Sequence, residues 1–389
     1  MTEQPRPYLT LALVVTATLL GLMGTDLVLP AVPSLPQTLG GDAAAAQLVL
    51  AAYVGGTCAG LLAFGVLGDR FATRSLFVGS LVLTGMVSFA CAWAPGIAWL
   101  IVLRALQGAV AAGPAVFAPA IARAMFDEAR AVRAIGALGS IESLAPALAP
   151  ILGVWLLALG GWQLSFELIG AVALALAAIN LALPLIPQTG RRTAGRYALL
   201  LKDKIFLRYA LSQAFVLGGL LVFVFGAPAV MVRSFGGTIA DFIIMQVSGI
   251  ATFILAANFA GSLAARFGAE RIIGIGTAMA VAGAAGMLVY ALAGGASTIV
   301  ITALFVPINS GLGLRGPPGF YRAVVASHGD DARGSALVIL FIMAATALGT
   351  AAVAPFIEQG LVPLAGAAFV LEMAALACLL FLPRLPEAS

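Results

Sequence analysis

The sequence has little charge and few of the residues that commonly carry catalysis. Asp, Glu, Lys and Arg make up 9% of its 389 residues, against about 25% in soluble domains. It has one histidine, His328, and no His-Glu-x-x-His pattern for a catalytic zinc ion. Its three cysteines, Cys58, Cys91 and Cys378, fall in apolar runs, so no disulfide framework is implied. These shortages argue against a soluble domain and an intramembrane hydrolase, and we expect no enzyme activity, cofactor or metal.

Long apolar runs are what the sequence has in abundance. Hydrophobic residues make up 62% of the chain, and a membrane-crossing helix needs about 20 mostly apolar residues. Twelve runs are long enough, at residues 8–29, 46–66, 75–93, 97–121, 132–158, 162–185, 206–232, 240–264, 271–293, 297–321, 333–356 and 362–382. We therefore expect an all-α membrane protein with twelve transmembrane helices in a lipid bilayer. The first run is too long for a cleavable signal peptide and is one of many.

Two short charged segments repeat each other. Residues 65–74 and 261–271 align with an offset of 261 − 65 = 196, which is close to half of 389. The matching positions are Gly65, Leu67, Arg70 and Phe71 with Gly261, Leu263, Arg266 and Phe267. This repeat predicts two copies of one membrane unit. We expect two pseudo-symmetric six-helix bundles, residues 1–187 and 206–389, joined by a cytoplasmic linker at 188–205.

The basic residues favour one side of the predicted spans. With a cytoplasmic N-terminus, 17 of the 20 Lys and Arg residues fall in segments that face the cytoplasm. Such an excess of positive charge inside sets the orientation of membrane proteins. Only Arg233 falls outside, while Arg104 and Arg315 lie within spans. We predict a multi-pass protein of the cell (inner) membrane with both termini in the cytoplasm.

Charged residues inside spans are candidates for function, because a charge within the bilayer is costly. Asp26 lies late in an outward-running span and Arg104 early in an inward-running one. At about 1.5 Å of rise per residue, both reach the outer part of the membrane at similar depth. They are plausible partners, directly or through water, and Arg104 would favour an ionised Asp26. The alternative is a static ion pair that only fixes helix packing.

Glu142 lies near the middle of the fifth predicted span. It shares a helical stripe with Gly139, Pro146, Pro150 and Gly153, at spacings of three or four residues. Small residues and prolines on one face predict a kinked helix at a close-packed interface. Glu142 either faces a cavity beside that interface or has a hydroxyl partner.

Four motifs resemble a known family. Gly65-x-Leu-x-Asp69-Arg70-x-x-x-Arg74, between the second and third spans, resembles the signature loop of the major facilitator superfamily of transporters. Arg104-Ala-Leu-Gln107-Gly is similar to the fourth-span pattern of drug/proton antiporters. Residues 145–153 resemble the fifth-span antiporter motif in its Bcr/CflA variant, and residues 25–33 resemble the acid-and-proline pattern of the first span in that group.

The resemblance implies roles for particular residues. Proton and substrate coupling would use Asp26, Arg104 and Glu142. A substrate cavity would be lined by Gln107, Gln213 and Asn309. A cytoplasmic gate would contain Gly65, Asp69, Arg70, Arg74 and Arg266, and the antiporter motif would contain Pro146, Pro150 and Gly153. Because Ala265 stands where the first copy has Asp69, we expect a one-sided gate. Glu167 and Glu372 lie in helices that are peripheral in this superfamily, so structural or surface-cavity roles are expected for them.

The resemblance predicts the major facilitator fold and proton-coupled export of small amphipathic or cationic compounds by alternating access. The alternative on the same fold is uptake of a small metabolite or metal chelate. A channel is disfavoured, because the repeat with scattered single acids offers no charged ring. The expected partners are a small-molecule substrate, protons and lipid, with no nucleic acid, and we expect a monomer.

Overall fold

The computed structural model describes residues 7–187, 196–231 and 235–385. Within these residues the chain forms helices and no strand. Among the described residues, eleven helices are long and apolar enough to cross a membrane. The prediction of an all-α protein with many membrane spans is therefore confirmed, and the bounds of most spans agree with the sequence to within a few residues.

The chain divides into two compact units. Unit 1 comprises residues 1–125, 141–195 and 330–336, and unit 2 comprises residues 126–140, 196–329 and 337–389. The units do not follow a single division of the sequence near its middle. One short segment of the first half groups with unit 2, and one short segment of the second half groups with unit 1. These segments are residues 126–140 and residues 330–336, the latter at the start of a helix.

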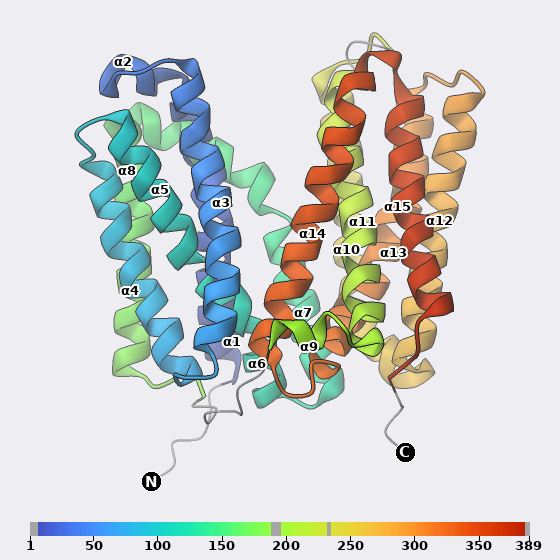
Figure 1. The fold of residues 1–389 in the computed structure, drawn as a ribbon. Coiled ribbons are helices and arrows are strands. Elements are labelled where there is room, and N and C mark those ends of the chain that lie inside the picture. The colour runs from blue at the N-terminus through green and yellow to red at the C-terminus, as the bar shows by residue number, and fades with distance from the viewer. Residues whose placement is uncertain (1–6, 188–195, 232–234, 386–389) are drawn as a thin grey trace. The chain divides into compact units, whose positions relative to one another are not determined.

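Unit 1 is built from long helices that run side by side (Figure 1). They are α1 (Pro7–Asp26), α3 (Ala43–Leu67), α4 (Thr73–Ala92), α5 (Ile97–Ala111), α6 (Gly113–Met125) and α8 (Ala145–Ala182). The short elements η1 (Leu29–Ser34) and α2 (Leu35–Leu39) follow α1. The predicted span 97–121 is interrupted at Ala112, between α5 and α6.

Unit 2 contains the remaining helices. They are α7 (Glu128–Glu142), which enters unit 1 from residue 141, then α9 (Tyr197–Leu200), α10 (Lys204–Ala229), α11 (Ile239–Phe267), α12 (Ala269–Leu292), α13 (Thr298–Val325), α14 (Asp331–Val353), η3 (Ala354–Gln359) and α15 (Leu361–Phe381). In the predicted linker, residues 188–195 lie outside the described part of the chain. The rest of the linker holds α9 and the start of α10, so it is largely helical.

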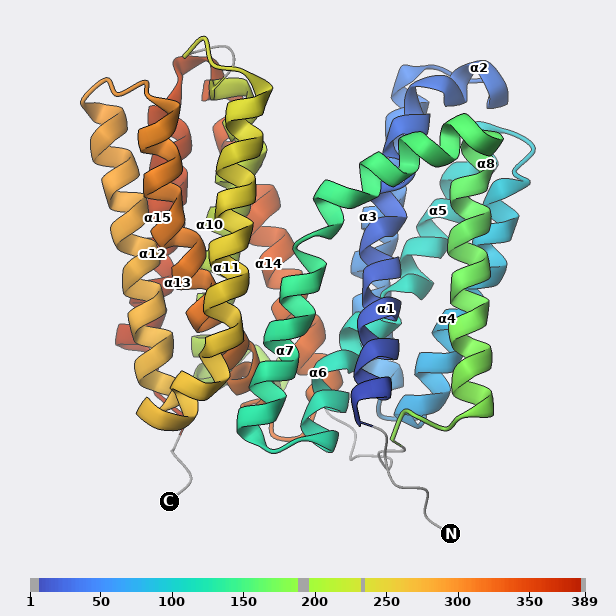
Figure 2. The same ribbon diagram turned by 180° about the vertical axis from the view of Figure 1, so that it is seen from behind.

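The predicted single span 132–158 is wrong in one respect. The chain leaves the helix at Ser143 and Leu144, directly after Glu142, and α8 then runs from Ala145 through what was predicted to be the sixth span. Within α8, Gly160 and Gly161 have non-helical backbone angles. Figure 2 shows the two parts of α8 meeting at an angle. The kink expected near Glu142 is therefore a complete break between α7 and α8.

Glycines let helix backbones touch. A Cβ atom added at Gly56 of α3 would lie 1.9 Å from the Ala105 carbonyl oxygen of α5, and one at Gly108 would lie 2.0 Å from the Tyr53 carbonyl oxygen. In unit 2, a Cβ added at Gly311 of α13 would lie 2.4 Å from the Gly276 oxygen of α12. Small residues at such contacts are the usual means of helix packing in membranes.

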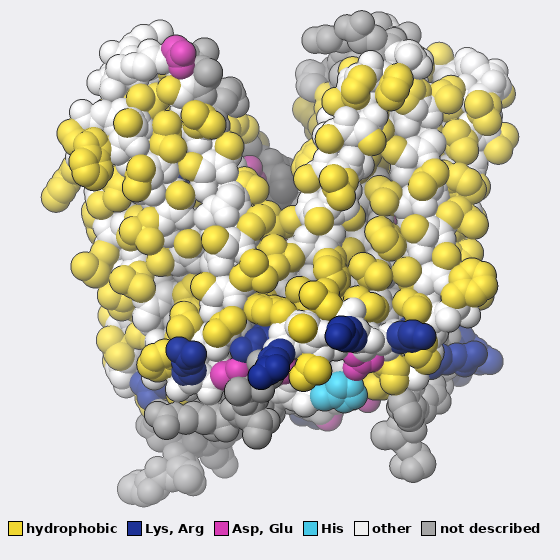
Figure 3. Space-filling view, in the orientation of Figure 1, with side chains coloured by type: hydrophobic (Ala, Val, Ile, Leu, Met, Phe, Trp, Pro, Cys, Tyr) yellow, Lys and Arg dark blue, Asp and Glu magenta, His cyan; other side chains and the backbone are white. Residues whose placement is uncertain are grey.

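Basic side chains are concentrated at one end of each unit (Figure 3). In unit 1 this is the end where α3 finishes and α4 begins, and in unit 2 it is the end where α15 finishes. The rest of the visible surface of each unit is mostly hydrophobic or uncharged.

The close contact at Gly56 leads to a prediction about stability, for which the neighbouring Gly55 provides the control. We expect Gly56→Ala to lower the midpoint of thermal unfolding of the purified protein in detergent, because overpacking costs about 1–3 kcal/mol. The neighbouring Gly55 has nothing within 4 Å of an added Cβ. Gly55→Ala should leave the midpoint unchanged or raise it, since alanine favours a helix by about 1 kcal/mol over glycine. Equal midpoints for the two variants would contradict the packing described here.

Candidate functional site

Arg104 is the central buried charge of unit 1. It lies on α5 and is fully buried. Its Nε donates to the Val49 carbonyl of α3 at 3.2 Å, and its Nη1 donates to the Gly24 carbonyl of α1 at 2.9 Å. Backbone oxygens on two other helices therefore hold the guanidinium, while its Nη2 has no hydrogen-bond partner.

Two side chains fix Arg104 further. The guanidinium lies over the ring of Tyr53, 4.1 Å from its centroid, and the Tyr53 hydroxyl donates to the Gly21 carbonyl at 2.6 Å. Nη1 also donates to Gln107 Oε1 at 2.7 Å, and Gln107 Nε2 donates to the Ser88 hydroxyl of α4 at 2.7 Å. Gln107 is 1% exposed. It links Arg104 to α4 in this conformation, and its assignment to a substrate cavity stays a prediction.

Asp26 is the last residue of α1 and is partly exposed. No hydrogen bond or ion pair joins its carboxylate to Arg104 or to any other described residue. The direct pairing considered from sequence is therefore absent in this conformation. In this conformation Nε and Nη1 of Arg104 donate to the Val49 and Gly24 carbonyls and to Gln107, Tyr53 packs against the guanidinium, and Nη2 has no hydrogen-bond partner.

Glu142 ends α7 and is partly exposed. The nearby Thr18 hydroxyl, on α1, donates to the Val15 carbonyl of its own helix at 3.0 Å. Both alternatives left open by the sequence, a cavity and a hydroxyl partner, therefore stay predictions. Thr18 precedes Asp26 by eight residues, or about 12 Å along the helix. Asp26 thus lies on α1 and Glu142 lies beside it. Neither acid forms an ion pair with a described residue.

The antiporter motif contacts the end of the first span. A Cβ added at Gly153 of α8 would lie 2.3 Å from the Leu27 carbonyl oxygen and 3.2 Å from Cδ of Pro30. Only glycine permits this approach, one residue beyond Asp26. The side chains of Pro146 and Pro150 lie outside the described part of the structure.

The loop between α3 and α4 forms a charged cluster with the start of α14. Asp69 Oδ2 accepts from Arg333 Nη2 at 2.6 Å, and Arg333 Nη1 donates to Asp330 at 2.8 Å. Both side chains of the Asp69–Arg333 pair are largely buried, at 12% and 4% exposed. Asp331 accepts from Arg123 of α6 at 2.7 Å.

The other predicted gate residues do not join this cluster. Arg74 donates to the side chain and carbonyl of Asn180 at the end of α8, at 3.3 Å and 2.9 Å. Arg70 is exposed, and Gly65 is buried in α3. Arg266 is exposed, with its guanidinium 5.1 Å from the centroid of the Phe267 ring. Asp69 is thus the predicted gate residue that makes the ionic contact.

Unit 2 holds a weaker version of the same cluster. Arg322 lies 3.6 Å from Glu128, as Arg123 does at 2.7 Å from Asp331. Arg130 pairs with Asp127 three residues earlier, as Arg333 does with Asp330. The counterpart of Asp69 is Ala265, which has no carboxylate, and Arg130 is largely exposed.

Gln213 and Asn309 are buried, each at 5% exposed. Asn309 Nδ2 donates to the Phe305 carbonyl of its own helix at 3.0 Å. Gln213 Oε1 has no hydrogen-bond partner. Their assignment to a substrate cavity stays a prediction.

Sequence reasoning missed Arg333 and Tyr53. A signal for Arg333 existed, since Asp330-x-x-Arg333 repeats Asp127-x-x-Arg130 with an offset of 203. Tyr53 lies three residues before Gly56 on the contact face of α3. Nothing in the sequence shows that its ring lies against Arg104.

Known proteins resemble this chain in sequence and fold. A chloramphenicol resistance protein of Pseudomonas aeruginosa is 30% identical over 276 residues, covering 68% of this chain and 64% of that protein. A bicyclomycin resistance protein homologue of Haemophilus influenzae is 24% identical over 289 residues, 72% of each chain. The chain therefore spans slightly less than two thirds of the first relative. The crystal structure of the E. coli fucose:proton symporter FucP superposes with a TM-score of 0.71 at 16% identity, over 96% of this chain and 98% of that one.

The sequence pattern of a whole family covers most of the chain. Residues 14–355 match the Major Facilitator Superfamily, in agreement with the loop motif at residues 65–74 and with the helical fold. The chain belongs to the Major Facilitator Superfamily, a family of membrane transporters.

Proposed function

We propose that the protein is a proton-coupled secondary transporter that exports small amphipathic or cationic compounds by alternating access. The observation that carries this proposal is the state of the acids in unit 1. Asp26 and Glu142 are partly exposed and form no ion pair with any described residue, while Arg104, buried beside α1, is held by backbone oxygens. Carboxylates without a fixed partner within a membrane can bind either a proton or a cation.

The coupling follows from competition for one negative charge. An ionised Asp26 attracts a cationic compound, and protonation of Asp26 removes that attraction and favours release. Arg104, tied to α1, α3 and α4, serves to hold the end of α1 in place. Glu142 is the second carboxyl, and the break after it lets α7 and α8 change their angle without breaking a continuous helix.

The Asp69–Arg333 pair is the gate in this proposal. It ties the loop after α3 to the first turn of α14, at the end of unit 1 where basic side chains gather. The charge distribution supports a cytoplasmic location for that end. Both termini would then be cytoplasmic in the inner membrane, and the protein would act as a monomer.

Names of relatives support the class of substrate. The two relatives described above are named for resistance to chloramphenicol and bicyclomycin. Export of a toxic compound is the simplest activity that confers resistance through a membrane protein.

If the Asp69–Arg333 pair is the gate, its loss should slow transport without weakening substrate binding. We expect Asp69→Asn to slow proton-driven efflux from proteoliposomes about tenfold or more. Hydrogen bonds to charged groups contribute about 1.5–3 kcal/mol, and about 1.4 kcal/mol is a factor of ten in rate. Substrate affinity of the purified variant should stay close to wild type. The matched control is Asp127→Asn, an exposed acid of the weaker cluster in unit 2, which should transport normally. Normal turnover in Asp69→Asn would disprove the gate.

Asp26 predicts how substrate binding depends on pH. In the wild type, binding of a cationic compound should weaken as the pH falls, because a protonated Asp26 no longer attracts it. In Asp26→Asn, binding should be weak at every pH, its pH dependence should flatten, and proton-driven export should stop while the protein still inserts. The measurement is the dissociation constant of tetraphenylphosphonium across a pH series. If Asp26→Asn keeps the wild-type pH dependence and Glu142→Gln loses it, the coupling acid is Glu142.

A further inference from the structure

Glu372 is a buried carboxyl group in unit 2 for which the proposed transport cycle has no role. It lies on α15 and is 0% exposed. Neither of its carboxylate oxygens has a hydrogen-bond partner. It is the twelfth of the 21 residues of α15, or about 17 Å from the helix start, near the middle of the membrane. An ionised carboxylate with no hydrogen bond in such a place is far more costly than a neutral acid.

The nearest opposite charge does not bond to it. Arg315 of α13 is fully buried and is the charge that acts on Glu372. Its Nη1 donates to the Ser212 carbonyl at 2.8 Å, and its Nη2 donates to the Ser212 hydroxyl at 2.9 Å. Its Nε has no partner. Arg315 therefore directs its two terminal nitrogens at α10. In this conformation it forms no ion pair with Glu372.

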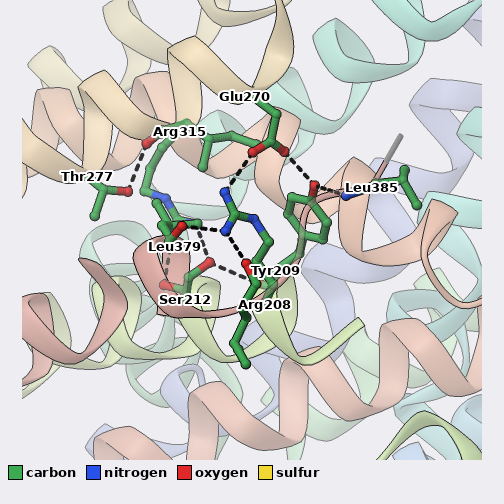
Figure 4. A network of polar contacts seen from close by, with 10 residues as sticks. Arg208, Tyr209, Ser212, Glu270, Thr277, Arg315, Leu379 and Leu385 are labelled. Atoms are coloured by element: carbon green, nitrogen blue, oxygen red, sulfur yellow. Dashed lines mark hydrogen bonds and ion pairs between the residues drawn. The ribbon is translucent and has the colours of Figure 1, made fainter. Parts of the chain in front are cut away.

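The other charged groups near α15 are already paired with each other (Figure 4). Arg208 of α10 bonds Glu270 of α12 at 2.9 Å and also donates to the Leu379 and Leu382 carbonyls. The Tyr209 hydroxyl donates to Glu270 as well. Cys378 is a further titratable group among the described residues, on α15 itself. None of these groups bonds to Glu372.

Glycine backbones lie directly beside the acid and the arginine. A Cβ added at Gly219 of α10 would lie 3.4 Å from Glu372 Oε1. One added at Gly319 of α13 would lie 3.2 Å from Arg315 Nη2 and 3.1 Å from Gln213 Oε1. Glu372, Arg315 and Gln213 therefore each have a polar atom without a hydrogen-bond partner beside Gly219 or Gly319.

We propose that Glu372 is a proton-binding site of unit 2, holding a neutral carboxylic acid while Arg315 is bonded to Ser212. When Arg315 leaves Ser212 and turns toward Glu372, the O–H bond of the acid breaks and the proton passes to water. The carboxylate that remains is neutralised by the guanidinium. The site is separate from Asp26 and Glu142, and it does not depend on which compound is transported.

Infrared spectroscopy tests this without any transport assay. A protonated carboxyl group has its own carbonyl-stretch band, which shifts on exchange into D₂O. Protein in lipid nanodiscs is titrated from mildly acidic to alkaline pH, in the absence of substrate. We expect the wild type to show a band from a buried acid and Glu372→Gln to lack it. The matched control is Glu167→Gln, on α8 of unit 1, which should retain the band.

A second variant tests the role of Ser212. Ser212→Ala removes one hydrogen bond that keeps Arg315 away from Glu372, so Glu372 should lose its proton at a pH about one unit lower. This shift is measurable even where Glu372→Gln fails to fold. A Glu372→Gln spectrum identical to wild type would overturn the proposal, because Glu372 would then be ionised throughout. A titration midpoint that Ser212→Ala leaves unmoved would overturn the switch by Arg315.

Discussion

The structure depends on direct contact between helix backbones at glycines. Helices in lipid gain little from the hydrophobic effect when they associate, so close van der Waals packing must hold them together. Gly56 and Gly108 bring α3 and α5 together in unit 1, and Gly276 and Gly311 do the same for α12 and α13 in unit 2. Gly153 places α8 against the end of the first span. These approaches bring carbonyl groups of one helix within reach of polar side chains on another.

That closeness decides how the two fully buried arginines of the described residues, Arg104 and Arg315, are satisfied. Arg104 bonds carbonyls of α1 and α3, and Arg315 bonds the carbonyl and hydroxyl of Ser212 on α10. In both units the arginine therefore ties helices together without using a carboxylate. The acids Asp26, Glu142 and Glu372 are left without ionic partners, and an acid in that state within a membrane can take up and release a proton. Asp69 differs from these acids, because it forms an ion pair with Arg333 and both side chains are largely buried.

Much of the fold could be predicted from the sequence, because each span carries its own signal in about 20 apolar residues. The break after Glu142 was predicted only as a kink, since apolar content does not change where the backbone leaves the helix. Asp69 was singled out by its motif, but its partner Arg333 lies 264 residues away. Arg104 was paired by depth with Asp26, and depth says nothing about rotation around the helix axis. The carbonyls that hold Arg104 have no signature in a sequence.

The central claim is that acids without ionic partners exchange protons for substrate. The most direct measurement is proton release by the purified protein in weakly buffered solution when a cationic compound is added, followed with a pH indicator over a compound panel. The account predicts that compounds which bind release protons, and that release disappears at a pH where the acids are already ionised. Saturable binding with no proton release at any pH would contradict it.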